Sequence, residues 1–318
     1  MLKTSQLTKQ FPGPNGKAVL AVDHLDLQVS AGQVFGFLGP NGAGKTTTVR
    51  MLTSLIAPTS GEAWVNNFKV GREDREIRRT VGILTESPGM YDRLSAEKNL
   101  TIYAHLYEVR DIKGQVEKYL RMLGLWDRRD DVVGGFSKGM KQKLAICRAL
   151  LHEPKMLFLD EPTAGLDPEA AKLVNDFIRE LKTEGRTIFI NTHNLDEADR
   201  LCDRIGVIKQ KLLIVDSPEN LRQRLYGRQV VFHLRQAPPA VMELVRGLAF
   251  VREVQSLTTE SGDKLVIALD NPEEQNPIVI RKLVEAGVDI QFVGELRHSL
   301  EEIYLKLINT PGPAGSGE

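Results

Sequence analysis

The chain has 318 residues and a formal net charge of zero, because 42 lysines and arginines balance 42 aspartates and glutamates. A protein that coats polyanions would carry a basic excess, so the charge argues against that class, and we expect no nucleic-acid partner. No apolar run approaches the ~18–20 residues of a membrane-spanning helix, and "MLKTSQLTKQ" lacks the apolar core of a signal peptide. We expect two domains in the cytosol, and any membrane role to depend on a partner.

The first 55 residues predict an antiparallel sheet followed by a phosphate-binding loop. Residues 1–33 alternate polar and apolar positions, as in "AVLAVDHLDLQV". The next segment, "VFGFLGPNGAGKTTTVRML", runs from a buried strand through a glycine-rich loop into a helix. The loop fits G-x-x-x-x-G-K-[ST], and strand, loop and helix are the context that this motif requires.

This loop predicts a nucleotide and a metal ion. Its glycines let backbone N–H groups point at phosphate oxygens, and the following helix adds its positive N-terminal end. We expect Lys45 to neutralise the β- and γ-phosphates and the Thr46 hydroxyl to ligate Mg²⁺. The expected phosphate site comprises Gly39, Pro40, Asn41, Gly42, Ala43, Gly44, Lys45, Thr46 and Thr47.

Residues ~87–150 are predicted to be mostly helical and to end in "GGFSKGMKQKLAICRALL". Ser95 is the expected N-cap of one helix. The tyrosines at 91, 103 and 107 are expected in the core rather than at a contact surface. The two cysteines, Cys147 and Cys202, lie in apolar helix-like segments and are expected to be buried free thiols.

Two further strands end in polar residues. The apolar run 156–159 ends in Asp160 and Glu161, and adjacent carboxylates there are costly without a cationic partner such as a Mg²⁺–nucleotide. We expect Asp160 to hold the metal's shell through water and Glu161 to polarise an attacking water. Asp167 and Pro168 predict a helix start. "RTIFINTH" is a third buried strand and ends at His193, where open α/β sheets bind ligands.

Beyond this α/β region the pattern changes. "RIGVIKQKLLIVDSPENL" predicts a hairpin and then an exit from the domain near residue 217. Residues 218–310 read as β-α-β-β-α-β, which suggests a small ferredoxin-like α+β domain, closed by a helix with a capping box at Ser299 and Glu302. No catalytic cluster is evident there, so we expect a regulatory or dimer-stabilising role. Residues 311–318, "PGPAGSGE", are predicted to be a flexible tail.

Five motifs in order carry a family resemblance. "GPNGAGKTT", "FSKGM", "MLFLDEP", "AGLD" and "NTH" resemble, in order and spacing, the ATPase subunits of ATP-binding cassette (ABC) transporters, over roughly residues 1–217. The chain is similar to the ATPases of bacterial daunorubicin-resistance-type exporters. The resemblance implies a phosphate-loop ATPase domain with a mixed sheet, an antiparallel β subdomain and a helical subdomain.

The resemblance also assigns roles. Residues 39–47 resemble the Walker A loop, and Asp160 and Glu161 resemble the Walker B aspartate and the catalytic glutamate. Asp167 resembles the D-loop aspartate at the dimer interface, and His193 the switch histidine that contacts the γ-phosphate. Phe11 stands where the family usually has an aromatic residue, commonly tyrosine, stacking on adenine; the alternative is a plain core or loop phenylalanine.

Two positions depart from the family pattern. Glu86 replaces the Q-loop glutamine; it can still bind Mg²⁺ through oxygen but cannot donate an amide hydrogen bond while ionised. An exposed loop acid is the alternative. The family signature Leu-Ser-Gly-Gly-Gln is here Phe-Ser-Lys-Gly-Met, which keeps Ser137 and Gly139 and adds Lys138. The serine hydroxyl and the helix N-terminus behind it suit a γ-phosphate.

The resemblance therefore implies an ATP- and Mg²⁺-dependent ATPase that forms an ATP-sandwich homodimer. It would sit on the cytoplasmic face of the membrane and power transport, with export favoured, through a separate permease docked on the helical insert. One alternative is a soluble ABC ATPase acting on nucleic acid or ribosomes; another is a regulatory module that holds ATP and scarcely hydrolyses it. The short spacing between Lys45 and Asp160 leaves no room for a long coiled coil, and the single phosphate loop favours a transporter subunit.

Overall fold

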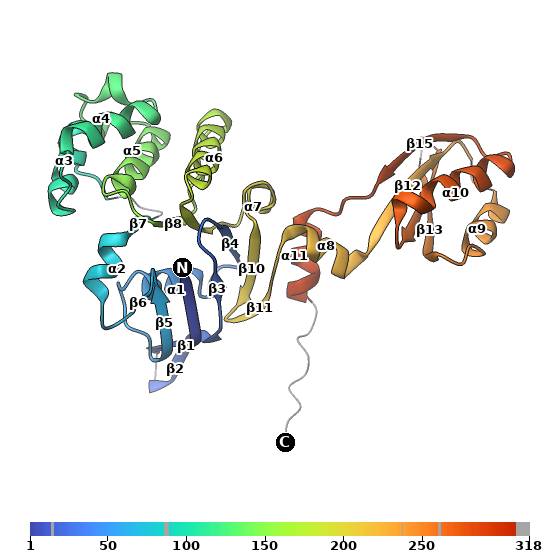
Figure 1. The fold of residues 1–318 in the computed structure, drawn as a ribbon, viewed down its shortest axis with the longest axis horizontal. Coiled ribbons are helices and arrows are strands. Elements are labelled where there is room, and N and C mark those ends of the chain that lie inside the picture. The colour runs from blue at the N-terminus through green and yellow to red at the C-terminus, as the bar shows by residue number, and fades with distance from the viewer. Residues whose placement is uncertain (14–15, 86–88, 237, 260–261, 310–318) are drawn as a thin grey trace. The chain divides into compact units, whose positions relative to one another are not determined.

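The computed structural model describes residues 1–13, 16–85, 89–236, 238–259 and 262–309 (Figure 1). Contacts divide the chain into two compact units, Met1–Ser217 and a second that begins at Pro218. The predicted flexible tail, 311–318, lies outside the described residues. Within the described ranges, no helix combines the length and the apolar character that crossing a membrane would require.

The centre of the first unit is a six-stranded mixed sheet in the order β11-β10-β4-β9-β8-β7. Five strands run parallel, and β11 closes one edge as the antiparallel partner of β10. Every residue of β4 and β9 is buried, as expected of central strands covered on both faces. The strands are β4 Val34–Leu38, β7 Val81–Leu84, β8 Met156–Asp160, β9 Thr187–Asn191, β10 Arg204–Lys209 and β11 Lys211–Asp216.

An antiparallel sheet forms a second layer of this unit, as the alternation of residues 1–33 predicts. Its strand order is β2-β1-β5-β6, and β3 also pairs with β1. The strands are β1 Leu2–Pro12, β2 Ala18–Leu25, β3 Gln28–Val29, β5 Ser60–Val65 and β6 Phe68–Lys69.

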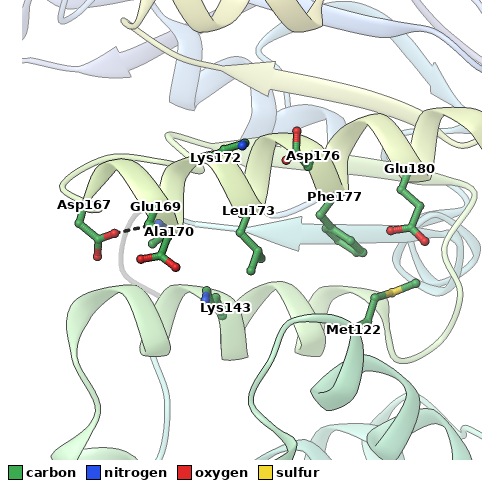
Figure 2. A pocket seen from close by; sticks show the side chains of 10 residues that line it. All are labelled: Met122, Lys143, Asp167, Glu169, Ala170, Lys172, Leu173, Asp176, Phe177 and Glu180. Carbon is green, nitrogen blue, oxygen red and sulfur yellow. Dashed lines mark hydrogen bonds between the residues drawn. The ribbon is translucent and has the colours of Figure 1, made fainter.

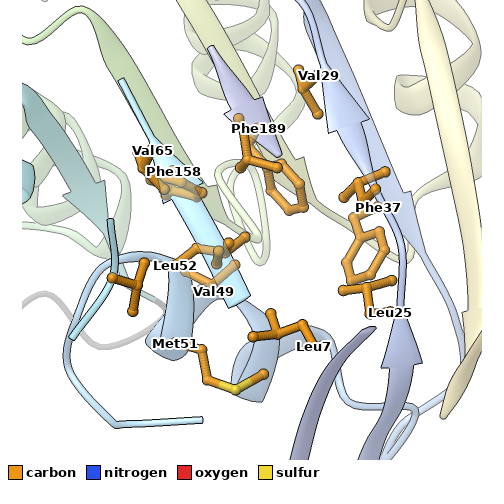
Figure 3. Close-up of a cluster of buried hydrophobic side chains, with 14 of the residues drawn as sticks. Leu7, Leu25, Val29, Phe37, Val49, Met51, Leu52, Val65, Phe158 and Phe189 are labelled. Carbon is orange, nitrogen blue, oxygen red and sulfur yellow. The ribbon is translucent and has the colours of Figure 1, made fainter. Parts of the chain in front are cut away.

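The helix after the phosphate loop packs into the core of the first unit (Figure 3). Phe189 of β9 lies at the centre of an aromatic group, with ring centroids 5.3 Å from Phe37 and 5.5 Å from Phe158. Val49 and Met51 of α1 join the same buried cluster, so burial of α1 fixes the loop that precedes it. The helices around the sheet are α1 Lys45–Leu52, α2 Asp74–Thr80, α6 Pro168–Thr183 and α7 Leu195–Leu201.

The helical insert lies between β7 and β8 in the chain (Figure 1). Ser95, Asp111 and Ser137 cap its three helices, each accepting a hydrogen bond from the backbone N–H three residues on. The predicted cap at Ser95 is confirmed. The insert contains α3 Ala96–Leu106, α4 Ile112–Met122, α5 Lys138–Leu150 and two 3-10 turns, Trp126–Arg128 and Val133–Gly135.

Three tyrosines of the insert form a ladder at its surface. The ring centroids of Tyr91 and Tyr103 lie 6.1 Å apart, those of Tyr103 and Tyr107 lie 6.5 Å apart, and Tyr107 meets His152 at 4.3 Å. Tyr91 is 48% exposed and Tyr107 is 36% exposed, so the prediction that these two rings lie in the core is wrong, whereas Tyr103 between them is half-buried. They stand beside the buried stripe of α3, which consists of Ala96, Asn99, Leu100 and Ala104.

The second unit contains a four-stranded sheet in the order β13-β14-β12-β15, in which every pair is antiparallel. Val230, Phe232 and Leu234 alternate along β12 and pack with α9 and α10 residues in a separate core. The elements are α8 Pro218–Tyr226, β12 Arg228–Leu234, α9 Pro239–Arg246, β13 Val251–Thr259, β14 Gly262–Leu269, α10 Pro272–Glu285, β15 Ile290–Glu295 and α11 Leu300–Asn309.

A polar cluster ties α11 to the rest of the second unit. His298 Nδ1 lies 2.5 Å from a Glu302 oxygen and Nε2 lies 2.9 Å from Gln229 Oε1, while the ring stacks on Tyr226. Ser299 Oγ accepts from the Glu302 N–H at 3.2 Å. The predicted capping box is therefore only half right, since the Glu302 carboxylate pairs with His298 instead of turning back to the backbone.

Candidate functional site

The polar residues that the sequence singles out follow three neighbouring strands. β4, β9 and β8 are adjacent and parallel, so their carboxyl ends lie at one edge of the sheet. The phosphate loop follows β4, Asp160 and Glu161 stand at the end of β8, and His193 follows β9. Sheet topology alone therefore brings a lysine, two carboxylates and an imidazole together.

The phosphate loop depends on two glycines in left-handed conformations. Gly42 has φ 79° and Gly44 has φ 98°, a region that side-chain-bearing residues rarely adopt. A Cβ on Gly44 would also collide with the carbonyl oxygen of Ala21. The Thr48 hydroxyl donates to the Gly44 carbonyl at 2.9 Å, which ties the loop to the first turn of α1.

Lys45 begins α1, and its amine folds back over the loop. Lys45 Nζ donates to Gly39 O at 2.6 Å and to Pro40 O at 3.2 Å. Burial lowers the pKa of the Lys45 ammonium, and the carboxylates of Glu161 and Asp160 oppose this shift. The cation therefore lies in the field of both acids that follow β8.

Thr46 and Asp160 bring oxygen atoms close together across the site. Thr46 Oγ1 lies 3.5 Å from Asp160 Oδ2, and Asn191 Nδ2 donates to Asp160 Oδ1 at 3.4 Å. A hydroxyl beside a carboxylate is an oxygen-rich donor set of the kind that Mg²⁺ prefers. Glu86, the third predicted metal-site residue, lies outside the described residues.

Glu161 and His193 form the most direct contact in the site. His193 Nδ1 lies 2.8 Å from Glu161 Oε1. Glu161 has φ 51°, an unusual value for a residue with a side chain, and its N–H donates to Asn191 O at 2.8 Å. The glutamate side chain is 18% exposed and the histidine side chain 72% exposed, so both can meet a ligand from solvent.

Two buried residues behind this pair were not singled out from the sequence. Thr192, which is 1% exposed, places its hydroxyl 3.5 Å from Glu161 Oε2 and 3.4 Å from Glu197 Oε2. Thr163 Oγ1 donates to the same Glu197 oxygen at 3.0 Å. The sequence could have indicated that Glu197 is buried, because its helical spacing with Ala198 and Leu201 puts the acid on the buried side of α7.

The signature residues lie at the start of α5, beside the segment that precedes α6. Ser137 Oγ accepts from the Met140 N–H at 3.2 Å. Lys138 extends over Gly165, so that a Cβ on this glycine would collide with the ammonium group. Gly139 faces Leu166 and Ala170. The signature therefore contacts the D-loop region of its own chain.

Asp167 caps α6, as the sequence predicts, by accepting from the Ala170 N–H at 2.8 Å. It lies at one end of a groove of about 590 Å³ between α6 and α5 (Figure 2). Lys143 of α5 and Met122 at the end of α4 face α6 across this groove. The lining includes no residue of the phosphate loop, so the groove is separate from the phosphate site.

Phe11 lies near the end of β1 and is 38% exposed, with Lys9 Nζ 5.1 Å from its ring centroid. This exposure excludes a plain core phenylalanine and leaves the ring accessible for stacking.

Cys147 and Cys202 are free and buried, as predicted.

Comparisons with known proteins point in one direction. A protein-family model described as "ABC transporter" matches residues 22–164. The bacitracin transport ATP-binding protein BcrA of Bacillus licheniformis is 35% identical over 309 residues, covering 97% of each chain. The daunorubicin resistance ATP-binding protein DrrA3 of Streptomyces coeruleorubidus is 34% identical over 291 residues, covering 90% of each.

A solved structure shows the same fold in the first unit. It is the ATP-binding cassette MJ0796, described as dimeric, in a post-hydrolysis state and bound to ADP and Pi. Its TM-score is 0.63 at 23% identity, and the match covers 68% of this chain and 98% of the cassette.

Proposed function

Because the chain belongs to the ATP-binding cassette transporter ATPases, we propose that it binds and hydrolyses ATP to power export through a separate membrane permease. The observation that carries this proposal is the meeting of Lys45, Glu161 and His193 at one edge of the parallel sheet, with the acid and the imidazole 2.8 Å apart. The relatives BcrA and DrrA3 are named as a bacitracin transport protein and a daunorubicin resistance protein. Those names support a transporter subunit over a soluble ATPase of nucleic acid or ribosomes.

The phosphate loop holds the triphosphate. N–H groups of the loop residues after Pro40 and the N-terminus of α1 face the phosphates, because the left-handed glycines turn this backbone inward. The Lys45 ammonium neutralises charge on the β- and γ-phosphates and stabilises the charge that develops during transfer. Phe11 supplies an exposed ring for stacking on adenine.

Glu161 and His193 act on the attacking water and the γ-phosphoryl group. Glu161 accepts a hydrogen bond from the water and orients it for in-line attack. His193 contacts the γ-phosphoryl oxygens, while its Nδ1 stays near the glutamate. Thr46 and Asp160 fit Mg²⁺, since both offer oxygen atoms. When bound, Mg²⁺ would neutralise phosphate charge, with Glu86 as a further oxygen ligand.

The second half of each nucleotide site comes from another copy of the chain. Ser137, Lys138 and Gly139 start α5, where a helix N-terminus and a serine hydroxyl suit a phosphate. Asp167 lies in the adjacent D-loop, which crosses the dimer interface. The dimeric state described for the MJ0796 cassette supports this arrangement.

The helical insert docks on the permease at the cytoplasmic face of the membrane. The exposed rings of Tyr91 and Tyr107, which flank the half-buried Tyr103, support this assignment, because aromatic rings at a surface are typical of protein contacts. Arg148 lies over Tyr103, 5.0 Å from its ring centroid, and adds a charge beside the ladder.

The proposal is tested by Glu161→Gln. We expect this variant to bind ATP with wild-type affinity, to accumulate as an ATP-bound dimer, and to hydrolyse ATP about 10²–10⁴-fold more slowly. Steady-state phosphate release and size-exclusion chromatography with light scattering give the two readouts. Glu184→Gln, on an exposed turn, is the matched control and should turn over normally. Wild-type turnover by Glu161→Gln would contradict the role of this residue.

A further inference from the structure

Glu197 is an acid buried directly behind the candidate site. It lies in the first turn of α7 and is 4% exposed. Its N–H donates to Asn194 Oδ1 at 3.1 Å, which fixes its backbone. Its Oε2 accepts from Thr163 Oγ1 at 3.0 Å. A carboxyl group so deeply buried is costly and usually has a specific role.

The Thr192 hydroxyl stands between Glu197 and Glu161. It accepts the Asn194 N–H at 3.0 Å, which leaves one hydrogen to donate and one further lone pair. The two carboxyl groups lie at nearly equal distances from this hydroxyl, 3.5 Å for Glu161 and 3.4 Å for Glu197. Its single hydrogen can reach only one of them at a time.

The other oxygen of Glu161 faces His193 at 2.8 Å. One oxygen of the glutamate therefore faces the imidazole, and the other faces Thr192. The orientation of the Glu161 carboxylate consequently depends on where the Thr192 hydroxyl points, and Glu197 is the competing partner for that hydroxyl.

Burial raises the pKa of the Glu197 carboxyl, and the Glu161 carboxylate raises it further, against the hydrogen bonds from Thr163 and Thr192. A protonated Glu197 can donate to the Thr192 oxygen, which leaves the threonine hydrogen for Glu161. An ionised Glu197 instead competes for that hydrogen.

We propose that Glu197 is a positioning residue for ATP hydrolysis, which acts through the Thr192 hydroxyl to hold the Glu161 carboxylate in its working orientation. This inference rests on the proposed role of Glu161 and deepens it. Glu197 does not touch the nucleotide, so its loss should lower kcat while the KM for ATP stays unchanged.

The test compares Glu197→Ala, Thr192→Val and the double variant with wild type. Each single change should lower kcat about tenfold with ATP KM within about twofold, and the double variant should lose no more than either single, because both act on one path. Glu197→Gln should recover most of the activity, since an amide nitrogen at the position of Oε2 can donate to the Thr192 oxygen and leave the threonine hydrogen for Glu161. Asp196→Ala, an exposed acid one residue earlier on α7, is the control and should match wild type.

Wild-type kcat in Thr192→Val would overturn the inference, as would independent, multiplying losses in the double variant. Thr192→Val keeps the side-chain volume and carries the same prediction if Glu197→Ala does not fold. A loss that follows only the thermal midpoint, with kcat per folded molecule unchanged, would also overturn it. Glu161→Gln is measured in parallel, because it tests the proposed function itself. Wild-type turnover in Glu161→Gln would contradict the proposed function, whereas slow turnover in Glu161→Gln with wild-type kcat in Thr192→Val would contradict only the role of Glu197.

Discussion

The two units of this chain contain similar elements but use charged side chains in opposite ways. In the first, Lys45, Asp160 and Glu161 approach one another at the ends of parallel strands. In the second, Arg228 pairs with Glu273 at 2.6 Å and His298 with Glu302 at 2.5 Å. Parallel strands end at one edge and bring their succeeding loops together there, whereas antiparallel strands distribute their ends over both edges. The parallel strands of the first unit thus gather charged residues into one candidate site, whereas the charged residues named in the second unit pair with each other.

The two units also differ in backbone conformation. All described non-glycine residues with a positive φ lie in the first unit, and Glu161 is one of them. Such conformations cost of order 1–3 kcal/mol and persist where the surroundings hold them, often at functional sites. The second unit has a separate core, and its described residues outside glycine keep negative φ values.

One glycine substitution in each unit tests whether backbone conformation distinguishes the two units. Gly44→Ala puts a side chain at φ 98° and against the Ala21 carbonyl, so the loop must move, and we expect ATP affinity to fall about 100-fold or more, that is about 2.8 kcal/mol. Gly294→Ala places its Cβ in open space and should leave ATP affinity unchanged. Calorimetric titration with ATP measures both, and equal affinities would show that loop conformation is not what binds ATP.

A second experiment asks whether the first unit completes its site with another copy. Ser137→Arg removes the α5 cap, worth about 1 kcal/mol, and adds a bulky cation to the surface proposed to meet the partner's ATP. We expect it to abolish ATP-driven dimerisation in the Glu161→Gln background, measured by light scattering. Lys138→Gly should change the dimer affinity by only about threefold, as one exposed charge contributes little. Equal damage from both changes would show that Lys138 is essential.

Removal of residues 218–318 tests the role of the second unit. The first unit is compact by contacts and contains every described residue of the proposed nucleotide site. We therefore expect wild-type ATP affinity in the truncated chain, with dimerisation weakened about tenfold or less. Unchanged dimerisation, ATPase activity and transport would contradict a regulatory or dimer-stabilising role.

The buried Glu197 carboxyl should make the stability of the fold depend weakly on pH. The pKa of Glu197 is raised in the folded protein, so the native state keeps this proton to higher pH than the unfolded chain does. Its stabilising contribution is complete below the ordinary glutamate pKa and is lost as pH rises through the raised value. Glu197→Gln does not titrate, so its thermal midpoint relative to wild type should rise by a few degrees between pH 5 and pH 8.

Much of the site could be predicted because its parts are local in sequence. The phosphate loop carries its own strand and helix, and Asp167 with Pro168 marks a helix start that the structure confirms. The left-handed backbone of Glu161 could not be predicted, because it depends on a hydrogen bond to Asn191, which belongs to a different strand. Thr192 was missed because its hydroxyl matters only through two acids from different elements.

Surface aromatic residues and caps show a second limit of sequence patterns. Tyr103 and Tyr107 have helix spacing that suits a core, yet Tyr107 is exposed and stacks on the half-buried Tyr103. Glu302 has the spacing of a capping box, yet His298 takes its carboxylate. Spacing defines which partners are within reach along one helix, whereas neighbours from elsewhere decide which of them is chosen.

The contact between Lys138 and Gly165 has a consequence for how this family can evolve. The Lys138 ammonium is the end of a flexible side chain and can move aside, but Gly165 has φ 68°, a left-handed conformation that residues with a Cβ rarely adopt. The backbone, and not the lysine, therefore fixes glycine at this position. In an alignment of relatives, glycine at the second position should be kept even in chains that carry a small residue in place of the lysine.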